Sequence, residues 1–372
     1  MKKKEANLIL VAILSLAFLL RVYNLDNLPR FGFNETFEEK TIFYEQAIRI
    51  SELGFAPYFN PASTQLSLSY SSIFYFFYSN PVSVRLASLF ANLVGLLFFY
   101  LFVREVDDEK TALVLLFFAS VSPTFIFLNR PGILDTGVMV LFSSALLFFF
   151  AKFFKNDKNV FLFLCSIFLG VGFCLNLSFL IIGLPFTLLL IFYGLKKKMF
   201  KKVILFVLFA LVLSSSLFYS LIEDYPKPYS STQIVLRSFT TRFEQACNYW
   251  LSPVYGWSNY RYELSDFSFK GFYEAVLLLN LLPLLLFVLF LKNNAGTRLI
   301  LFLLFSGLFF SGLTPLIRGN EYYPYFHLTC LFPVFNYVCF RVLAEKRFVY
   351  LAMALGLLNL FASFNLFFLR II

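Results

Sequence analysis

Charged residues are scarce in this sequence. Only 14% of its 372 residues are Asp, Glu, Lys or Arg, whereas 60% are hydrophobic and 55 are Phe. Soluble cores cannot hide that much apolar surface in a chain of this length, because a water-exposed surface needs polar and charged side chains. The scarcity excludes a water-soluble globular protein and predicts that much of the chain faces lipid.

Cysteine and histidine are too few and too scattered to form a metal-binding motif. The five cysteines show no metal-ligand spacing, and the chain has a single histidine. All the cysteines except Cys247 lie in or beside apolar runs, as membrane-core residues do. We therefore expect no metal site and no cofactor, with a divalent cation left open. The other four cysteines are Cys165, Cys174, Cys330 and Cys339.

The formal net charge of +10 could indicate a nucleic-acid partner. The basic residues, however, form no stripe interleaved with polar surface, and they sit beside apolar runs. That placement is typical of topology signals and of contacts with anionic lipids. Membrane lipids are therefore expected partners, and nucleic acid is not.

Eleven apolar runs are candidate membrane spans. The first follows residues 2–4, three lysines, without a convincing cleavage site for a signal peptide, and we interpret it as an uncleaved span. The stretch 160–195 is too long for one helix and is divided near Asn176 and Ser178. This pattern predicts an all-α polytopic membrane protein with about eleven transmembrane helices. The predicted spans cover residues 7–20, 85–103, 111–128, 136–154, 160–175, 178–195, 203–221, 272–291, 299–315, 325–342 and 348–369.

Lysine and arginine concentrate in alternate segments between these spans. By the positive-inside rule this places the N-terminus in the cytoplasm and the C-terminus outside, in a multi-pass protein of the plasma membrane. The outer segments 24–84 and 222–271 are long, whereas every inner loop is short. We expect a single membrane domain, 1–372, without a soluble domain, and a functional site in the outer segments.

The first outer segment contains a helix start with an acidic residue just before it. Thr36 and Glu39 form a capping box, and apolar residues follow at helical spacing. This predicts an amphipathic juxtamembrane helix, and the stretch 66–77 predicts a second one. Asn34 and Glu35 would precede the first helix, where free N–H groups favour an anion such as a phosphate. The alternative is that the acidic residues only complement the helix dipole, and that the second helix only packs against the spans.

A short turn, 129–135, places Arg130 and Asp135 between two apolar helices at the outer face. An ionisable pair at that depth is costly unless it is paired or functional. Either the two form an ion pair that only fixes the turn, or Asp135 is an acidic group at the mouth of a cavity. In the second case Arg130 orients it or binds a phosphate.

Two further outer segments are rich in aromatic and polar residues. The segment 222–271 holds Trp250 and Trp257 among several tyrosines, which suits either a membrane interface or the flat face of a sugar. The last outer turn offers a cation, hydroxyl groups and the one histidine: Arg318, Tyr323 and His327. These side chains could hold a phosphate head group, although a lone histidine is more often structural.

The order of these elements resembles the GT-C superfamily of membrane glycosyltransferases, particularly the branch with protein O-mannosyltransferases and lipid A aminoarabinose transferases. The likeness is strongest over residues 21–154. There Arg21 ends the first span, an acidic motif follows, residues 80–89 (NPVSVRLASL) open the second span, and residues 120–130 (SVSPTFIFLNR) precede Asp135. Beyond residue 200 the likeness rests on topology and the last outer turn.

The resemblance implies transfer of a sugar from a polyprenyl-phosphate carrier at the outer face, usually with inversion at the anomeric carbon. Asp135 matches the second outer-face acid of the superfamily. The first motif is normally Asp-Glu and appears here as Asn34-Glu35, so the usual base is replaced by an amide that cannot accept a proton. A lysine often found near the fifth or sixth span is also absent, with Asn176 there instead.

We therefore predict an inverting glycosyltransferase in which the base is Glu35 or Asp135 and the acceptor hydroxyl belongs to a protein, lipid or glycan. Arg130 and Arg318 would neutralise the phosphate of the donor. A non-catalytic relative that binds a lipid-linked sugar or partners another transferase is the alternative, because Asn34 removes the expected carboxylate. A transporter is disfavoured, because the spans carry almost no charge at mid-membrane.

Overall fold

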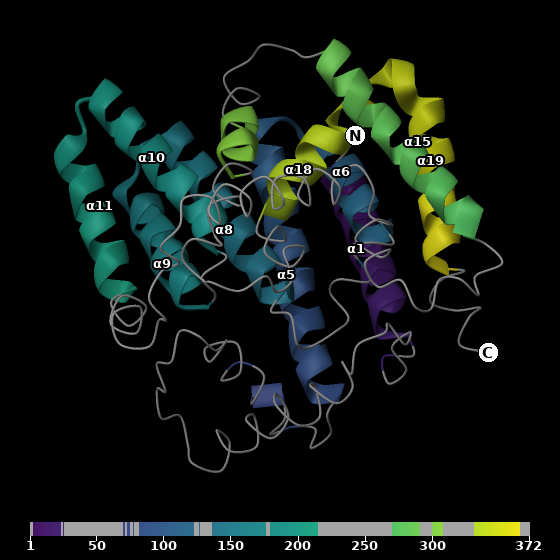
Figure 1. Cartoon of the computed structure of the whole chain (residues 1–372), viewed down its shortest axis with the longest axis horizontal. Helices are drawn as coiled ribbons and strands as arrows, with labels where there is room; N and C mark the ends of the chain where they lie inside the picture. The colour runs from purple at the N-terminus through teal and green to yellow at the C-terminus, as the bar shows by residue number, and fades with distance from the viewer. Residues whose placement is uncertain are drawn as a thin grey trace, which may run out of the picture.

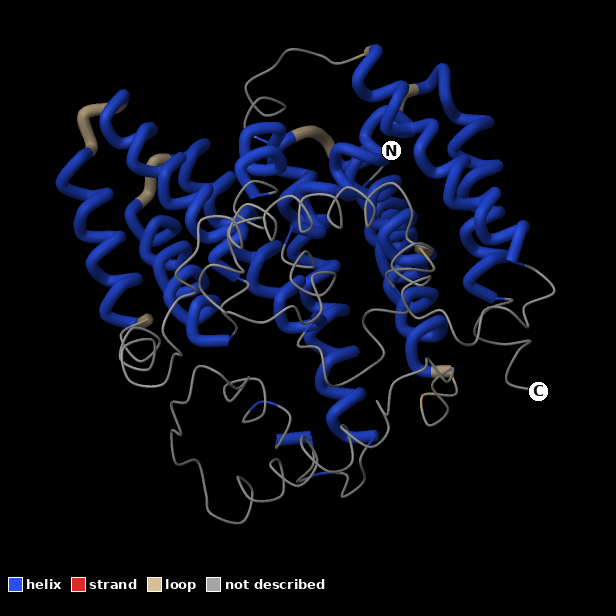
Figure 2. Tube along the Cα trace, in the orientation of Figure 1, coloured by secondary structure: helices blue, strands red, loops and turns tan. Residues whose placement is uncertain are grey.

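All regular structure in the described part of the computed structural model is helical (Figure 1, Figure 2). No strand occurs among these residues, which confirms the predicted all-α class. The structure describes residues 3–23, 25, 70, 73–74, 77, 82–122, 126, 136–175, 179–214, 270–290, 300–307 and 331–364.

Helices joined by short connections, such as α5 with α6 and α8 with α9, lie side by side and run in opposite directions (Figure 1). Short connections favour this arrangement, because a helix that follows after a few residues must run back along its predecessor. Residues 300–307 are also helical. The labelled helices are α1 (Lys3–Val22), α5 (Val82–Val106), α6 (Glu109–Val121), α8 (Thr136–Asn156), α9 (Asn159–Leu175), α10 (Leu180–Lys196), α11 (Phe200–Leu213), α15 (Lys270–Leu289), α18 (Phe332–Phe340) and α19 (Val349–Phe364).

Each predicted span overlaps helix in the described residues. Among those residues, four helical stretches are long and apolar enough to cross a membrane. The proposed division of residues 160–195 is confirmed, because α9 ends at Leu175 and α10 begins at Leu180. The four stretches are Lys3–Val22, Arg85–Val106, Gly137–Asn156 and Lys346–Phe364.

Helix α6 ends at Val121, inside the predicted span 111–128, and residue 126 is again helical. Ser122 is extended, with ψ at 120°, and Pro123 follows it. The proline ring disfavours helical backbone in the preceding residue, which accounts for the earlier end. The helix start is set by Asp108, whose carboxylate accepts a hydrogen bond from the Thr111 N–H at 2.7 Å.

Helices α5 and α8 approach each other closely. A Cβ at Gly95 of α5 would lie 2.8 Å from the backbone nitrogen of Leu141 in α8. Small residues permit such contact between helices in a membrane, where close packing replaces the hydrophobic effect as the driving force. Nearby, the ring of Phe98 lies 5.8 Å from those of Phe148 and Phe149, centroid to centroid. The many phenylalanines therefore also fill space between helices.

The outside of the bundle is apolar. Leu205 is 70% exposed and Val212 is 67% exposed, both on α11, and Leu289 at the end of α15 is 74% exposed. Large apolar side chains with this exposure are stable where lipid surrounds them. The chain is therefore a membrane protein.

Two of the three described cysteines are buried in the core, and Cys174 is partly exposed. Cys165 in α9 and Cys339 in α18 are buried, which confirms their interpretation as membrane-core residues. Within the residues that the structure describes, no three His, Cys, Asp or Glu side chains gather as a metal site would require.

We call the end of the bundle where α1 and α6 finish and α5 and α8 begin the predicted outer end, and the opposite end the predicted cytoplasmic end. At the predicted cytoplasmic end, Asp107 links the α5–α6 turn to α18. Its carboxylate accepts hydrogen bonds from Arg341 Nε at 2.8 Å and Nη2 at 3.2 Å, and from the Tyr337 hydroxyl. Glu105 pairs with Lys152 of α8 at 2.5 Å. These pairs tie three helices together at that end.

Of the predicted juxtamembrane helices, the second is described in part. Residues 70, 73–74 and 77 are helical. The Tyr70 hydroxyl donates a hydrogen bond to the Ala87 carbonyl oxygen at 3.1 Å, and Phe74 lies 5.9 Å from Phe90, ring centroid to centroid. Burial raises the pKa of Tyr70 to about 12, so this phenol remains a protonated donor. These contacts support the packing role, in which the helix braces α5. The first juxtamembrane helix and the tryptophan-rich segment 222–269 lie outside the described residues.

Candidate functional site

The structure describes the frame of the predicted site. Four helix ends carry its segments: α1, which leads to residues 34–35; α6 and α8, which flank the turn 129–135; and α18, which follows the last outer turn. The ends of α1, α6 and α8 lie at the predicted outer end of the bundle (Figure 1), whereas α18 begins beside Phe99, in the half of α5 toward the opposite end. The predicted site residues themselves lie outside the described residues: Asn34, Glu35, Arg130, Asp135, Arg318, Tyr323 and His327.

The C-terminal carbonyls of α6 are all hydrogen-bonded. A helix end leaves four carbonyls without a partner inside the helix, and in lipid each would be costly. Arg21 of α1 donates from Nη2 to the Ala119 oxygen at 3.4 Å and from Nη1 to the Ser120 oxygen at 3.0 Å. The hydroxyl of Ser363 in α19 donates to the Val121 oxygen at 2.7 Å. The fourth carbonyl, that of Ser122, accepts a hydrogen bond from the backbone N–H of residue 126 at 3.0 Å.

Arg21 is therefore a buried cation held by carbonyl dipoles. Its side chain is 0% exposed, and it also donates to the Ala17 oxygen of its own helix at 3.1 Å. The guanidinium lies at the C-terminal ends of both α1 and α6, where the helix dipoles favour positive charge. From the sequence, Arg21 belongs to the family likeness and has no predicted role. The sequence feature that could have indicated a role for Arg21 is a basic residue in the last turn of an apolar span.

Arg85 braces the chain that leaves α1. It is 6% exposed near the start of α5, and its Nη1 donates to the Leu25 oxygen at 2.6 Å. Leu25 is itself 5% exposed and lies three residues past the last residue of α1, Val22. The chain toward Asn34 and Glu35 therefore departs from a point fixed on α5.

The start of α8 is fixed against the same helix. Gly137 lies so close to α5 that a Cβ there would be 2.0 Å from the Ser88 backbone oxygen. Only glycine leaves room for that contact. Because Asp135 precedes Gly137 by two residues, α5 also sets where the turn 129–135 rejoins the bundle.

We expect Gly137→Ala to destabilise the protein by about 1–3 kcal/mol, because the added methyl meets backbone and the two helices must separate. Thermal unfolding of the purified protein in detergent would measure the change. Gly356→Ala is the matched control, since its Cβ would meet the ring of Phe117, a side chain that can move. An equal loss of stability in both variants would contradict the close-packing argument.

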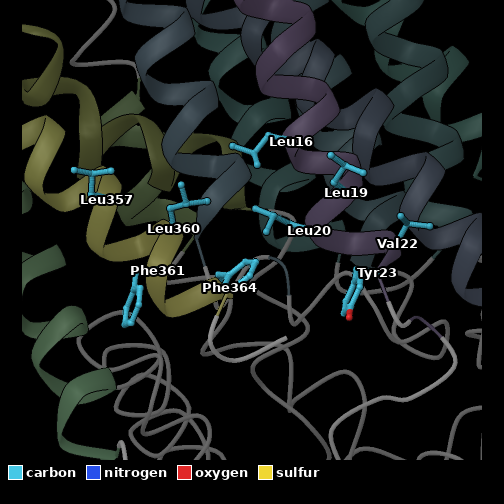
Figure 3. A pocket seen from close by; sticks show the side chains of 9 residues that line it. All are labelled: Leu16, Leu19, Leu20, Val22, Tyr23, Leu357, Leu360, Phe361 and Phe364. Carbon is cyan, nitrogen blue, oxygen red and sulfur yellow. The ribbon is translucent and has the colours of Figure 1, made fainter. Parts of the chain in front are cut away.

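An apolar groove runs between α1 and α19 at the predicted outer end (Figure 3). Its volume is about 640 Å³, and the Tyr23 hydroxyl is the one polar side-chain group among its lining residues. Such walls suit a hydrocarbon chain and cannot hold a charged head group. The lining side chains come from Leu16, Leu19, Leu20, Val22, Tyr23, Leu357, Leu360, Phe361 and Phe364.

The comparisons with known proteins agree with this architecture. Residues 69–219 match the family described as dolichyl-phosphate-mannose-protein mannosyltransferase. This segment includes α5, α6 and α8, which frame the turn carrying Arg130 and Asp135. No curated protein matches the sequence.

Solved structures share the fold over almost the whole chain. ArnT from Cupriavidus metallidurans bound to undecaprenyl phosphate superposes with a TM-score of 0.59 and 14% identity, covering 95% of this chain and 63% of ArnT. The apo oligosaccharyltransferase from Archaeoglobus fulgidus superposes with a TM-score of 0.58 and 13% identity, covering 98% of this chain and 56% of the enzyme. The oligosaccharyltransferase AglB of the same organism, in complex with an inhibitory peptide and a dolichol-phosphate, superposes with a TM-score of 0.54 and 12% identity, covering 98% of this chain and 55% of AglB.

The chain thus spans less than two thirds of the length of these proteins. At such low identity the likeness concerns the fold. The family match, the all-helical architecture and the structural matches together confirm the resemblance found in the sequence: the chain has the fold of the GT-C superfamily of membrane glycosyltransferases.

Proposed function

We propose that this protein is an inverting glycosyltransferase that moves a sugar from a polyprenyl-phosphate carrier to an acceptor hydroxyl. The observation that carries the proposal is the fold shared over 95% of the chain with ArnT, a transferase whose structure holds undecaprenyl phosphate. The groove between α1 and α19 adds support, because a lipid-linked donor needs apolar protein surface within the membrane.

In the proposed reaction the acceptor oxygen attacks C1 of the sugar from the face opposite the phosphate. The C1–oxygen bond to phosphate breaks, and polyprenyl phosphate leaves with the bonding electrons. Glu35 or Asp135 takes the proton of the acceptor hydroxyl. Arg130 and Arg318 neutralise the phosphate, while Tyr323 and His327 donate hydrogen bonds to the head group. Asn34 donates a hydrogen bond to the sugar or phosphate.

No metal has a necessary part in this scheme. Phosphate is already a good leaving group, so the protein mainly supplies a base, positioning and cations. We therefore propose that transfer needs no cofactor and persists in the presence of EDTA.

A transfer assay on the purified protein tests the proposal. Polyprenyl phosphates with different labelled sugars are supplied together with protein, lipid and glycan acceptors, with and without EDTA. Consumption of one donor and appearance of a labelled acceptor are expected. Tight donor binding without turnover would favour the alternative, a protein that presents a lipid-linked sugar or partners another transferase.

The proposed location is the plasma membrane, with the N-terminus in the cytoplasm, the C-terminus outside and the site at the outer face. We expect a membrane-impermeant maleimide to label a cysteine added at the C-terminus in intact cells, because eleven spans place the two termini on opposite sides. A cysteine added at the N-terminus should react only after permeabilisation. Labelling of the C-terminal cysteine only after permeabilisation would refute the eleven-span topology.

A further inference from the structure

We propose that Arg21 and Ser363 are positioning residues for sugar transfer. They would hold the end of α6, and with it the turn that carries Arg130 and Asp135, in place relative to the segment with Asn34 and Glu35. This inference rests on the proposed function. It assigns a role to two buried side chains that touch no substrate.

The geometry explains why arginine occupies the first position. Arg21 bonds two carbonyls of α6 and one of α1, which requires several donors in one plane. Lysine has the charge but lacks the planar fork. Arg21 contributes to stability, because without it the Ala119 and Ser120 carbonyls would lack these hydrogen bonds. Because the same guanidinium bonds both helices, it also fixes one arrangement of α1 against α6.

The position of the contacts links them to the predicted site. Both acidic segments depart from helix ends that these contacts join, Glu35 from α1 and Asp135 from the turn after α6. Ser363 ties the same α6 end to α19 through the Val121 carbonyl. With α6 held from two sides, its end cannot shift independently of α1. A displacement of about 1 Å at reacting groups can reduce a rate about 100-fold.

Steady-state kinetics of Arg21→Lys, Arg21→Gln and Ser363→Ala would test the role. We expect kcat to fall about 10- to 100-fold in the Arg21 variants, less in Arg21→Lys than in Arg21→Gln, and by a smaller factor in Ser363→Ala. The KM for the lipid donor should change less than about threefold, because substrate-binding groups remain present. Arg341→Gln is the matched control: it removes a partly buried guanidinium at the other end of the bundle and should lower the melting temperature without lowering kcat.

A purely structural role predicts that kcat per folded molecule is the same in all four variants, and that result would overturn the proposal. If Arg21→Gln does not fold, Arg21→Lys and Ser363→Ala decide between the two outcomes.

A measurement independent of activity separates this proposal from the proposed function. Spin labels at Phe33→Cys and Ile133→Cys, with the native cysteines replaced by alanine, should show a broader distance distribution in Arg21→Lys than with Arg21 intact. An unchanged distribution would refute the positioning role even if the wild-type protein transfers no sugar.

Discussion

Asp135→Asn is expected to abolish sugar transfer while leaving the protein folded. Asparagine has nearly the shape of aspartate but cannot accept a proton or balance a nearby cation. Loss of a general base lowers a rate about 10²- to 10⁴-fold, which would put transfer near the background of the donor assay. Initial rates of the purified variant, with its melting temperature, measure both effects.

Asp157→Asn is the matched control for Asp135→Asn. Asp157 lies between α8 and α9 at the predicted cytoplasmic end and adopts a left-handed backbone, with φ at 55°. Asparagine tolerates that conformation, so the same chemical change there should preserve both fold and transfer. Full activity of Asp135→Asn would exclude this carboxylate from the mechanism.

The competing explanation for Asp135 is an ion pair with Arg130 that only fixes the turn. It predicts poor folding of Asp135→Asn, because an unpaired cation would remain beside the membrane. The double variant Arg130→Gln/Asp135→Asn would then recover stability. In the catalytic interpretation the double variant is folded but inactive, as the single variant is.

The sequence predicted the helices well because one physical quantity determines them. A run of about 20 apolar residues must span the bilayer as a helix, since lipid offers no other partner for the backbone. The break after α6 has a local cause that is visible in the sequence. Pro123 restricts Ser122, but the apolar run continues past it, and hydropathy alone does not register that break.

The contacts that frame the site could not be predicted from the sequence. Arg21, at the end of a span, resembles a side chain that extends to the membrane surface, yet it points inward to carbonyls about a hundred residues away. The partners belong to α6, and Ser363 approaches the same helix end from α19. Such convergence depends on how the helices pack. The chemistry of the site, in contrast, was predicted from residue types in outer segments and a family likeness.

Asn34 is where this chain departs from the superfamily at the chemistry itself, and its variants should separate an active enzyme from a binding protein. If Glu35 or Asp135 has taken over as the base, Asn34 serves as a hydrogen-bond donor. Loss of one neutral hydrogen bond typically costs about 0.5–1.5 kcal/mol, so Asn34→Ala should slow transfer only about 2- to 13-fold.

If Glu35 is the base, Glu35→Gln should reduce transfer about 10²- to 10⁴-fold and thus be far more damaging than Asn34→Ala. We expect this result, because a protein that has lost catalysis would not need the charged groups of Arg130, Asp135 and the Arg318 turn together at one site. Donor hydrolysis and transfer measured for both variants would decide it. An active Glu35→Gln enzyme would remove Glu35 as the base and leave Asp135.

Asn34→Asp tests the opposite case. If catalysis was lost together with the carboxylate, restoring it should create transfer or raise it about 10²- to 10⁴-fold, since a positioned base is worth that factor. If the base is already present elsewhere, a second carboxylate beside Glu35 should help little, because two neighbouring acids disfavour ionisation of each other. The two cases predict opposite changes in the same variant. A large gain in Asn34→Asp would therefore refute the active-enzyme proposal, and little change or a loss alongside measurable wild-type transfer would support it.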